Sequence, residues 1–222
     1  MPKNILITGA NRGIGLALTK QYLAKGDTVY AVCRKASAQL VMLDGVKIFE
    51  GIDVSDDKDL TKLKESLTDV SIDILINNAG IMSEESLGDI DFQAVTHQFL
   101  VNAIGPLKTT QALLVNLKKG SKVAIITSRM GSISDNTSGG WYGYRMSKSA
   151  VNSAAVSLAQ DLKPEGISVM LLHPGFVQTD LVDNQGDISA KQAAINLVNR
   201  IEEQNLQGSG SFIHANGGSL PW

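Results

Sequence analysis

The sequence predicts an α/β protein with a doubly wound parallel sheet of about seven strands and helices on both faces. Three observations support this prediction. Short runs rich in Ile, Val and Leu alternate with longer segments of helical spacing along the 222-residue chain. These runs show little alternation of polar and apolar residues, as expected for parallel strands buried on both faces. A glycine-rich segment, residues 8–15, directly follows the first run.

The apolar runs predict seven strands, because each is of strand length and is bounded by polar or turn-forming residues. They cover residues 4–8, 28–33, 47–51, 72–77, 122–127, 168–172 and 211–214. The segments between them predict helices at residues 14–25, 37–43, 55–67, 90–117, 145–162 and 189–204. In the third helix we expect Ser55 to be the capping residue, with Asp56 and Asp57 in the first turn. No repeat or linker is visible, so we expect one domain over residues 1–222.

The composition bounds the classes of function. The chain is 43% hydrophobic and 19% charged, with a formal net charge of −2. The sequence has no stripe of basic residues, so we do not expect nucleic acid as a partner. One cysteine, Cys33, allows no internal disulfide, and the chain starts without the pattern of a signal peptide. No apolar run reaches the ~18 residues of a membrane span. The three histidines have no metal-ligand spacing, so we expect no metal site. The single cysteine and the lack of a membrane span lead us to expect a cytoplasmic protein without a membrane partner.

Three glycines predict a phosphate site at the end of the first predicted strand. Gly9, Gly13 and Gly15 follow Ile5-Leu6-Ile7-Thr8 and open the first predicted helix. Glycine there permits a tight turn and brings phosphate oxygens close to the amides of the helix N-terminus. A purely structural turn is the alternative, and the position between strand and helix favours the dinucleotide site.

The residues after the second strand favour NADP(H) over NAD(H). Sites for NAD usually place an acid there, about 20 residues beyond the glycines, to hold the ribose 2′-hydroxyl. This chain has Cys33-Arg34-Lys35 instead. A guanidinium at Arg34 would accept a 2′-phosphate, and Arg12 in the glycine loop would add a second positive charge.

A tyrosine and a lysine are spaced for proton transfer. Tyr144 and Lys148 are four residues apart on a predicted helix, so their side chains share one face. A phenol has a pKa near ~10, and we expect the ammonium beside it to lower that pKa. Tyr142 is a weaker rival, because its neighbour four residues on is Met146. Together with the glycine loop, the pair predicts hydride transfer and proton transfer in one site.

These motifs, in this order, resemble the short-chain dehydrogenase/reductase family, a family of Rossmann-fold enzymes. The matching segments are Thr8-Gly9 to Gly15, Asp53-Val54, Asn77-Asn78-Ala79-Gly80, Asn102, Ser128, Tyr144 with Lys148, and Pro174-Gly175 with Thr179. The resemblance implies a catalytic set of Asn102, Ser128, Tyr144 and Lys148. It implies that NADP(H) contacts Gly9, Asn11, Arg12, Gly13, Ile14, Gly15, Arg34, Asp53, Val54, Asn78, Ala79, Gly80, Tyr144, Lys148, Pro174, Gly175, Val177 and Thr179.

The resemblance also implies a role for each catalytic residue. Tyr144 would protonate the developing alkoxide, and Ser128 would hold the carbonyl oxygen by a hydrogen bond. Lys148 would lower the pKa of Tyr144 and bind the nicotinamide ribose, while Asn102 would hold a water for proton relay. Ser132 is a rival to Ser128, because the interval from Ser128 to Tyr144 is longer than the family's usual one.

Within the family, the segment from Ser128 to Gly140 and the ending from Ser211-Phe212 to Pro221-Trp222 resemble C-factor-like and sniffer-type carbonyl reductases. We therefore expect NADPH-dependent reduction of small or apolar aldehydes and ketones. The alternatives are an NADP-dependent alcohol dehydrogenase and a C-factor-like signalling or binding protein. The substrate pocket is predicted to contain Met130, Trp141, Phe176 and Leu181. The resemblance implies a homodimer or homotetramer paired through the helices near 90–117 and 145–162.

Overall fold

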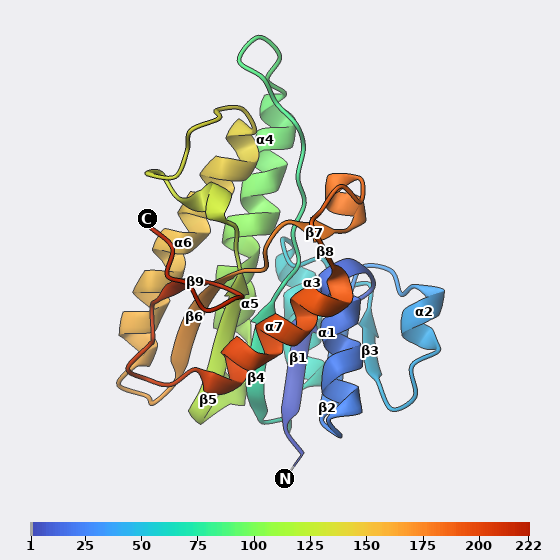
Figure 1. The fold of residues 1–222 in the computed structure, drawn as a ribbon. Helices are drawn as coiled ribbons and strands as arrows, with labels where there is room; N and C mark the ends of the chain where they lie inside the picture. The colour runs from blue at the N-terminus through green and yellow to red at the C-terminus, as the bar shows by residue number, and fades with distance from the viewer. Residues whose placement is uncertain (1) are drawn as a thin grey trace.

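The computed structural model describes residues 2–222 and contains a seven-stranded sheet in which every strand is parallel to its neighbours (Figure 1). The strand order is β3-β2-β1-β4-β5-β6-β9, so the predicted fold class is confirmed. The strands are β1 (Asn4–Thr8), β2 (Thr28–Cys33), β3 (Lys47–Glu50), β4 (Ile72–Asn77), β5 (Leu117–Ile126), β6 (Ser168–His173) and β9 (Phe212–His214).

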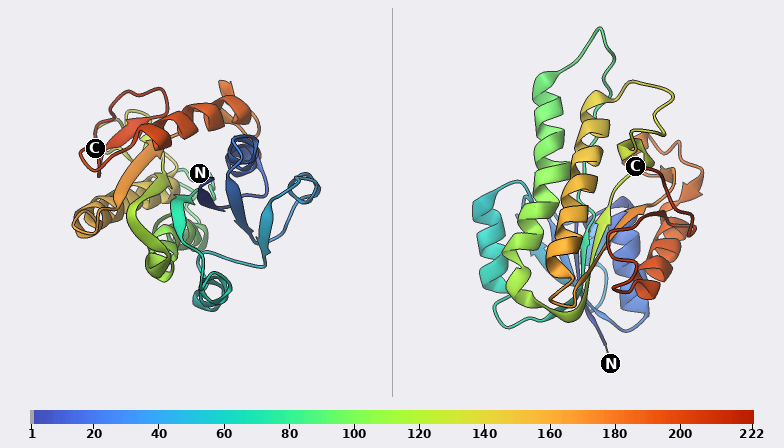
Figure 2. Two further views of the ribbon diagram at one scale, coloured as in Figure 1. Left: turned by 90° about the horizontal axis from the view of Figure 1, so that it is seen from below. Right: turned by 90° about the vertical axis from the view of Figure 1, so that its left-hand side faces the viewer.

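Helices cover both faces of the sheet (Figure 2). The helices are α1 (Gly13–Ala24), α2 (Ala38–Val41), α3 (Asp57–Ser66), α4 (Phe92–Phe99), α5 (Gly105–Ala112), α6 (Tyr142–Leu162) and α7 (Ala190–Glu203). Alternate residues of each strand enter opposite cores, which explains why the strands are apolar throughout. On β1, Leu6 packs with α3 and α6, whereas Ile5 and Ile7 pack with α1 and α7.

The strand order reverses direction between β1 and β4. The chain builds β1, β2 and β3 outward on one side, and then returns to place β4 on the other side of β1. The loops leaving these strands therefore diverge, and a crevice forms at the carboxyl ends of the strands. The glycine loop after β1 and the segment Asn78-Ala79-Gly80 after β4 both lie at this edge.

The prediction of one helix over residues 90–117 and a strand from 122 was wrong at the junction. The observed helix contains a π-helical turn, Leu100–Ile104, between α4 and α5, and ends in a 3-10 turn, Leu114–Asn116. Strand β5 already begins at Leu117, which pairs with Ile72 before the register shifts. The apolar residues keep a helical spacing up to Leu117, but this residue pairs with β4 and therefore belongs to the strand.

Smaller corrections concern caps and short strands. Asp56, not Ser55, caps α3 by accepting hydrogen bonds from the backbone of Lys58 and Asp59, because Ser55 is bound to Asp53. Helix α6 begins at Tyr142, three residues earlier than predicted. Two short strands, β7 (Val177–Gln178) and β8 (Ile188–Ser189), pair with each other and were not predicted. Within residues 2–222 no helix is both long and apolar enough to cross a membrane.

Candidate active site

Two adjoining cavities lie at the carboxyl edge of the sheet. The first, about 360 Å³, runs over the glycine loop between the ends of β1, β2 and β4. The second, about 660 Å³, lies between the start of α6 and the segment after β6. Tyr144 lines both cavities, as do Pro174, Thr179 and Leu181. This shared wall makes the junction of the cavities the natural place for two ligands to meet.

In the glycine loop, backbone atoms lie so close to Gly9 and Gly15 that a side chain has no room at either position. Gly9 and Gly13 have φ of 65° and 52°, a region that residues with a side chain rarely adopt. A Cβ on Gly15 would lie 2.2 Å from the carbonyl oxygen of Gly9, and one on Gly9 would lie 2.8 Å from Cα of Ala79. No side chain caps the N-terminus of α1. The loop therefore fits a phosphate-bearing group, because the backbone is uncovered at a helix N-terminus.

Thr8 and Asn78 tie this loop to the end of β4. The Thr8 hydroxyl accepts hydrogen bonds from the backbone N–H groups of Asn78 and Ala79 at 3.0 and 3.1 Å. The Asn78 side-chain amide donates to the carbonyls of Thr8 and Gly9. These bonds hold the floor of the first cavity from two sides. The contribution of Thr8 was not predicted, although the residue belongs to the glycine motif.

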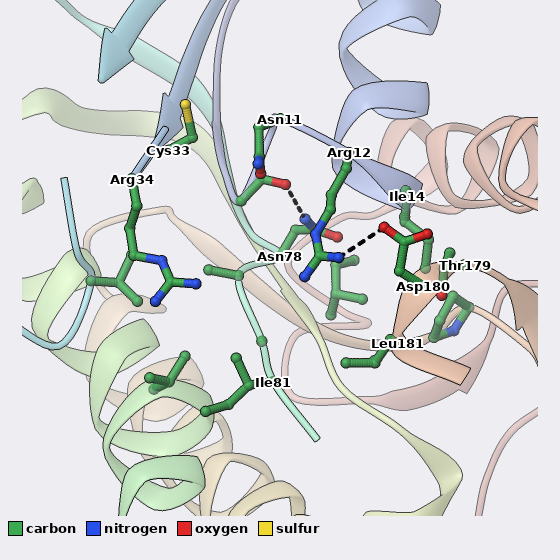
Figure 3. Close-up of a pocket in the computed structure, with 18 of the residues that line it drawn as sticks. Asn11, Arg12, Ile14, Cys33, Arg34, Asn78, Ile81, Thr179, Asp180 and Leu181 are labelled. Carbon is green, nitrogen blue, oxygen red and sulfur yellow. Dashed lines mark hydrogen bonds and ion pairs between the residues drawn. The ribbon is translucent and has the colours of Figure 1, made fainter. Parts of the chain in front are cut away.

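The two arginines of the first cavity each face an acid, and Figure 3 shows the pair of Arg12 with Asp180. Arg12 Nη1 lies 2.8 Å from Asp180 Oδ2, across the mouth of the cavity, and both side chains are exposed. Arg34 lies after β2 with Nη1 3.9 Å from Asp53 Oδ2. Burial raises the pKa of Asp53, but hydrogen bonds from Ser55 and the charge of Arg34 outweigh it, so that the pKa lies below its usual value. Two guanidinium groups thus face a single cavity.

Ser128, Tyr144 and Lys148 lie together at the junction of the two cavities. All three are buried, and the Ser128 side chain lies near enough to the Tyr144 phenol to lower its pKa. Lys148 Nζ lies 5.6 Å from the centre of the Tyr144 ring and donates a 3.0 Å hydrogen bond to the carbonyl of Ile126. The predicted rival Ser132 lines neither cavity and accepts a hydrogen bond from the backbone of Asp135.

The expected lowering of the Tyr144 pKa is not found. Burial raises the pKa of Tyr144 to about 12, although the hydrogen bond with Ser128 lowers it. Burial also lowers the pKa of Lys148 to about 8, because the enclosed ammonium loses its hydration. Loss of hydration therefore dominates both groups, and the phenol remains protonated at neutral pH.

Asn102 lies behind the cavities and lines neither. It belongs to the π-helical turn and is 1% exposed. Its side chain exchanges two 2.8 Å hydrogen bonds with the backbone of Ile81 and donates to Ser147 Oγ at 3.0 Å. Asn102 thus connects the segment after β4 to α6, and its predicted role in holding a water stays a prediction.

A buried polar cluster supports the start of α6. Glu85 is 3% exposed, and its carboxylate accepts hydrogen bonds from Ser83 Oγ, Gln98 Nε2 and the backbone N–H of Gly143. Trp141 has a left-handed backbone with φ of 48°, and its N–H donates to the carbonyl of Glu85 at 2.9 Å. These bonds position the residues directly before Tyr144. The sequence contained no pattern that identified Glu85 or Gln98.

The second cavity combines apolar and charged walls. All four residues predicted for the substrate pocket line it: Met130, Trp141, Phe176 and Leu181. Two arginines, Arg129 and Arg145, also line it and were not predicted. His173 is buried against His214, with ring centres 4.9 Å apart, and burial lowers its pKa to about 3. His173 is therefore neutral at pH 7.

Most predicted cofactor contacts line one cavity or the other. Gly175 and Val177 line the second rather than the first, and Gly15 lines neither because it lies beneath the loop. The first cavity contains the other predicted contacts, namely Gly9, Asn11, Arg12, Gly13, Ile14, Arg34, Asp53, Val54, Asn78, Ala79, Gly80, Tyr144, Lys148, Pro174 and Thr179. Across residues 2–222, no group of His, Cys, Asp or Glu side chains is arranged to hold a metal ion.

Comparison with protein families shows which family the chain belongs to. Residues 3–190 match the model of the short chain dehydrogenase family. The chain belongs to the short-chain dehydrogenases. Among its relatives in this family, 1-hydroxy-2-glutathionyl-2-methyl-3-butene dehydrogenase of Rhodococcus sp. is 38% identical, covering 98% of this chain and 99% of that protein. The C-signal protein of Myxococcus xanthus is 44% identical over 68% of this chain and 93% of that protein.

Two solved structures extend the likeness to carbonyl reductases. Carbonyl reductase Sniffer of D. melanogaster superposes with a TM-score of 0.92 at 29% identity, covering 100% of both chains. NADPH-bound carbonyl reductase from chicken fatty liver superposes with a TM-score of 0.89 at 26% identity, covering 100% of this chain and 99% of that one. The predicted resemblance to C-factor-like and sniffer-type members of the short-chain dehydrogenases is therefore confirmed.

Proposed function

We propose that this short-chain dehydrogenase reduces aldehydes and ketones with NADPH, with Tyr144 as the proton donor. The observation that carries the proposal is the position of Tyr144, which forms part of both cavities, with Ser128 close enough to lower the pKa of its phenol. A group bound in the first cavity and a carbonyl compound bound in the second would meet at this phenol. Both binding sites would belong to one domain, residues 1–222.

The first cavity fits a dinucleotide that carries a 2′-phosphate. The glycine loop would receive the pyrophosphate, and Arg34 would bind the 2′-phosphate, because a guanidinium matches a phosphate in charge and in geometry. Arg12 would add a second positive charge after leaving Asp180. NADPH in the chicken carbonyl reductase structure is consistent with this choice. When bound, the nicotinamide supplies the hydride that reduces the carbonyl carbon.

Each residue at the junction has a separate task in the proposed reaction. Ser128 donates a hydrogen bond to the carbonyl oxygen and stabilises the negative charge that develops there. Tyr144 transfers its proton to that oxygen, and the product is an alcohol. Lys148 stabilises the phenolate that remains. A phenol that is protonated at neutral pH can give its proton to the carbonyl oxygen without first binding one from solvent.

Two other functions have support from relatives. The relative from Rhodococcus is named a dehydrogenase, so alcohol oxidation by the same residues is the second candidate. The likeness to C-signal supports a third, in which the protein binds the cofactor and acts as a signal without turnover. Turnover separates these functions, since a purely signalling role needs none.

The test replaces Tyr144 by Phe, which removes one oxygen and leaves the ring. We expect NADPH-dependent reduction of a panel of aldehydes to fall by about 10²–10⁴, the usual effect of a positioned general acid. NADPH affinity, followed by fluorescence titration, should stay within about threefold of the wild type. Tyr142→Phe is the matched control and should retain activity. Unchanged turnover in Tyr144→Phe would refute this role, and NADPH binding without any turnover in the wild type would favour the signalling function.

A further inference from the structure

The second cavity contains a guanidinium without an acidic partner. Arg145 directly follows Tyr144 on α6, and both side chains line this cavity. Arg145 Nη2 donates to Ser138 Oγ at 2.9 Å, while Nε is buried without a hydrogen-bond partner. Within residues 2–222, no carboxylate lies within 4.0 Å of its side-chain nitrogens.

The other arginine of the cavity, Arg129, forms an ion pair. Arg129 Nε lies 2.8 Å from Asp135 Oδ2, and this pairing is the main cause of the lowered pKa of Asp135. The pair therefore contributes no net charge to the wall. The remaining acids of the cavity, Glu84 and Asp183, are exposed to solvent. The charge of Arg145 also helps to lower the pKa of Asp135, but that carboxylate is held by Arg129, so among the described residues that line this cavity Arg145 is the arginine without an ion pair.

The size of the cavity adds a second argument. At about 660 Å³ it is much larger than a small aldehyde needs, and Ser128 and Tyr144 form only one part of its wall. Consecutive helix residues point about 100° apart, so Arg145 lines a different part from Tyr144. A partly buried guanidinium with unused donors favours a carboxylate, which it binds through charge-assisted hydrogen bonds.

We infer that the natural substrate carries a carboxylate in addition to its carbonyl, and that Arg145 binds this carboxylate while the carbonyl lies at Tyr144. This inference rests on the proposed carbonyl reduction, and it adds a charged group to the small or apolar aldehydes and ketones expected from the sequence. Arg145 would thereby select the substrate, whereas Ser128 and Tyr144 would carry out the chemistry.

The test compares 4-carboxybenzaldehyde with its methyl ester, in which a methyl group replaces the negative charge. For each enzyme we take the ratio of kcat/KM for the acid to kcat/KM for the ester, so that general losses of activity cancel. The wild type should prefer the acid. Arg145→Gln should lower the ratio about ten- to a hundredfold, the effect of losing one charge-assisted hydrogen-bonded contact. Arg145→Lys should retain part of the preference.

The control removes the other arginine without changing the net charge of the cavity, as Arg129→Gln combined with Asp135→Asn. Its ratio should remain within about threefold of the wild type. An ester-preferring wild type, or a ratio unaffected by Arg145→Gln, would overturn the inference while leaving carbonyl reduction intact. Loss of the preference in the control variant would also overturn it, since the carboxylate would then depend on Arg129.

A binding measurement covers the case in which no carbonyl compound is reduced. Calorimetry would compare 4-(hydroxymethyl)benzoate with its methyl ester, added to the protein in the presence of NADP⁺. Tighter binding of the acid in the wild type, lost in Arg145→Gln, would support the carboxylate site even though the proposed function had failed. Equal binding of acid and ester would overturn it.

Discussion

The buried carboxylate of Glu85 accepts a 3.1 Å hydrogen bond from the backbone N–H of Gly143, the residue before Tyr144. Trp141, at the N-cap position of α6, provides no side-chain cap, so Glu85 satisfies a free donor of the helix from a distant part of the chain. The same carboxylate accepts from Ser83 and Gln98. The segment after β4 is therefore coupled to the helix that carries Tyr144 and Lys148.

Glu85→Gln is expected to destabilise the protein by roughly 1–3 kcal/mol, because the new amide points a donor at donors and leaves buried groups unsatisfied. The turnover of aldehydes should fall as well, since the start of α6 loses its anchor. Urea denaturation gives the first quantity and steady-state kinetics the second. Glu84→Gln, at the exposed neighbouring position, should change stability by less than about 0.5 kcal/mol. Equal stability of the two variants would contradict the capping role.

Gly15→Ala is expected to abolish tight cofactor binding. The added methyl group would lie 2.2 Å from the Gly9 carbonyl oxygen, so the glycine loop would have to move. Gly88→Ala is the matched control, because a Cβ there has no heavy atom within 4 Å and the backbone is not left-handed. NADPH titration should show at least a tenfold loss for the first variant and none for the second. Unimpaired binding by Gly15→Ala would mean that the loop yields easily.

Arg34→Gln is expected to weaken NADPH binding about ten- to a hundredfold and to leave NADH binding nearly unchanged, since only NADPH carries the 2′-phosphate. Lys35→Gln serves as the control, because Lys35 follows Arg34 but does not line the first cavity. Fluorescence titration with both cofactors measures the preference. If the wild type binds NADH as tightly as NADPH, the proposed role of Arg34 is wrong.

Lys148→Met is expected to make the ligand-free protein more stable at pH 7, by roughly 1–3 kcal/mol, because it removes a buried, desolvated charge. The pKa of Lys148 is about 8 when folded, against its usual value of 10.5. Between these values the unfolded chain binds more protons, so the wild-type free energy of unfolding should rise with pH. Above pH 10 the raised pKa of Tyr144 should reverse that trend.

Urea denaturation from pH 7 to 9.5 measures this dependence on pH. The variant should lose the rise that begins near pH 8, and its aldehyde turnover should fall strongly. Lys163→Met, at an exposed position just after α6, should keep the wild-type profile. An unchanged slope in Lys148→Met would show that another group causes it.

The sequence predicted the sheet and the main site motifs because both depend on local patterns. Buried parallel strands are uniformly apolar, and the glycine loop and the Tyr144–Lys148 spacing are short segments with direct geometric consequences. Glu85 was missed because its partners are distant in sequence, with Gly143 58 residues away. The raised pKa of Tyr144 was missed because burial, and not the spacing to Lys148, decides it. The early start of β5 depends on pairing with β4, which no local pattern encodes.

The shared wall of the two cavities has a consequence for the order of events during turnover. Tyr144, Pro174 and Thr179 line both, so a compound filling the larger cavity would cover the part of the smaller one that these residues form. Under the proposed function, the dinucleotide would enter first and leave last, and the alcohol would depart before it. Product inhibition would then be that of an ordered mechanism, in which NADP⁺ competes with NADPH and not with the carbonyl substrate.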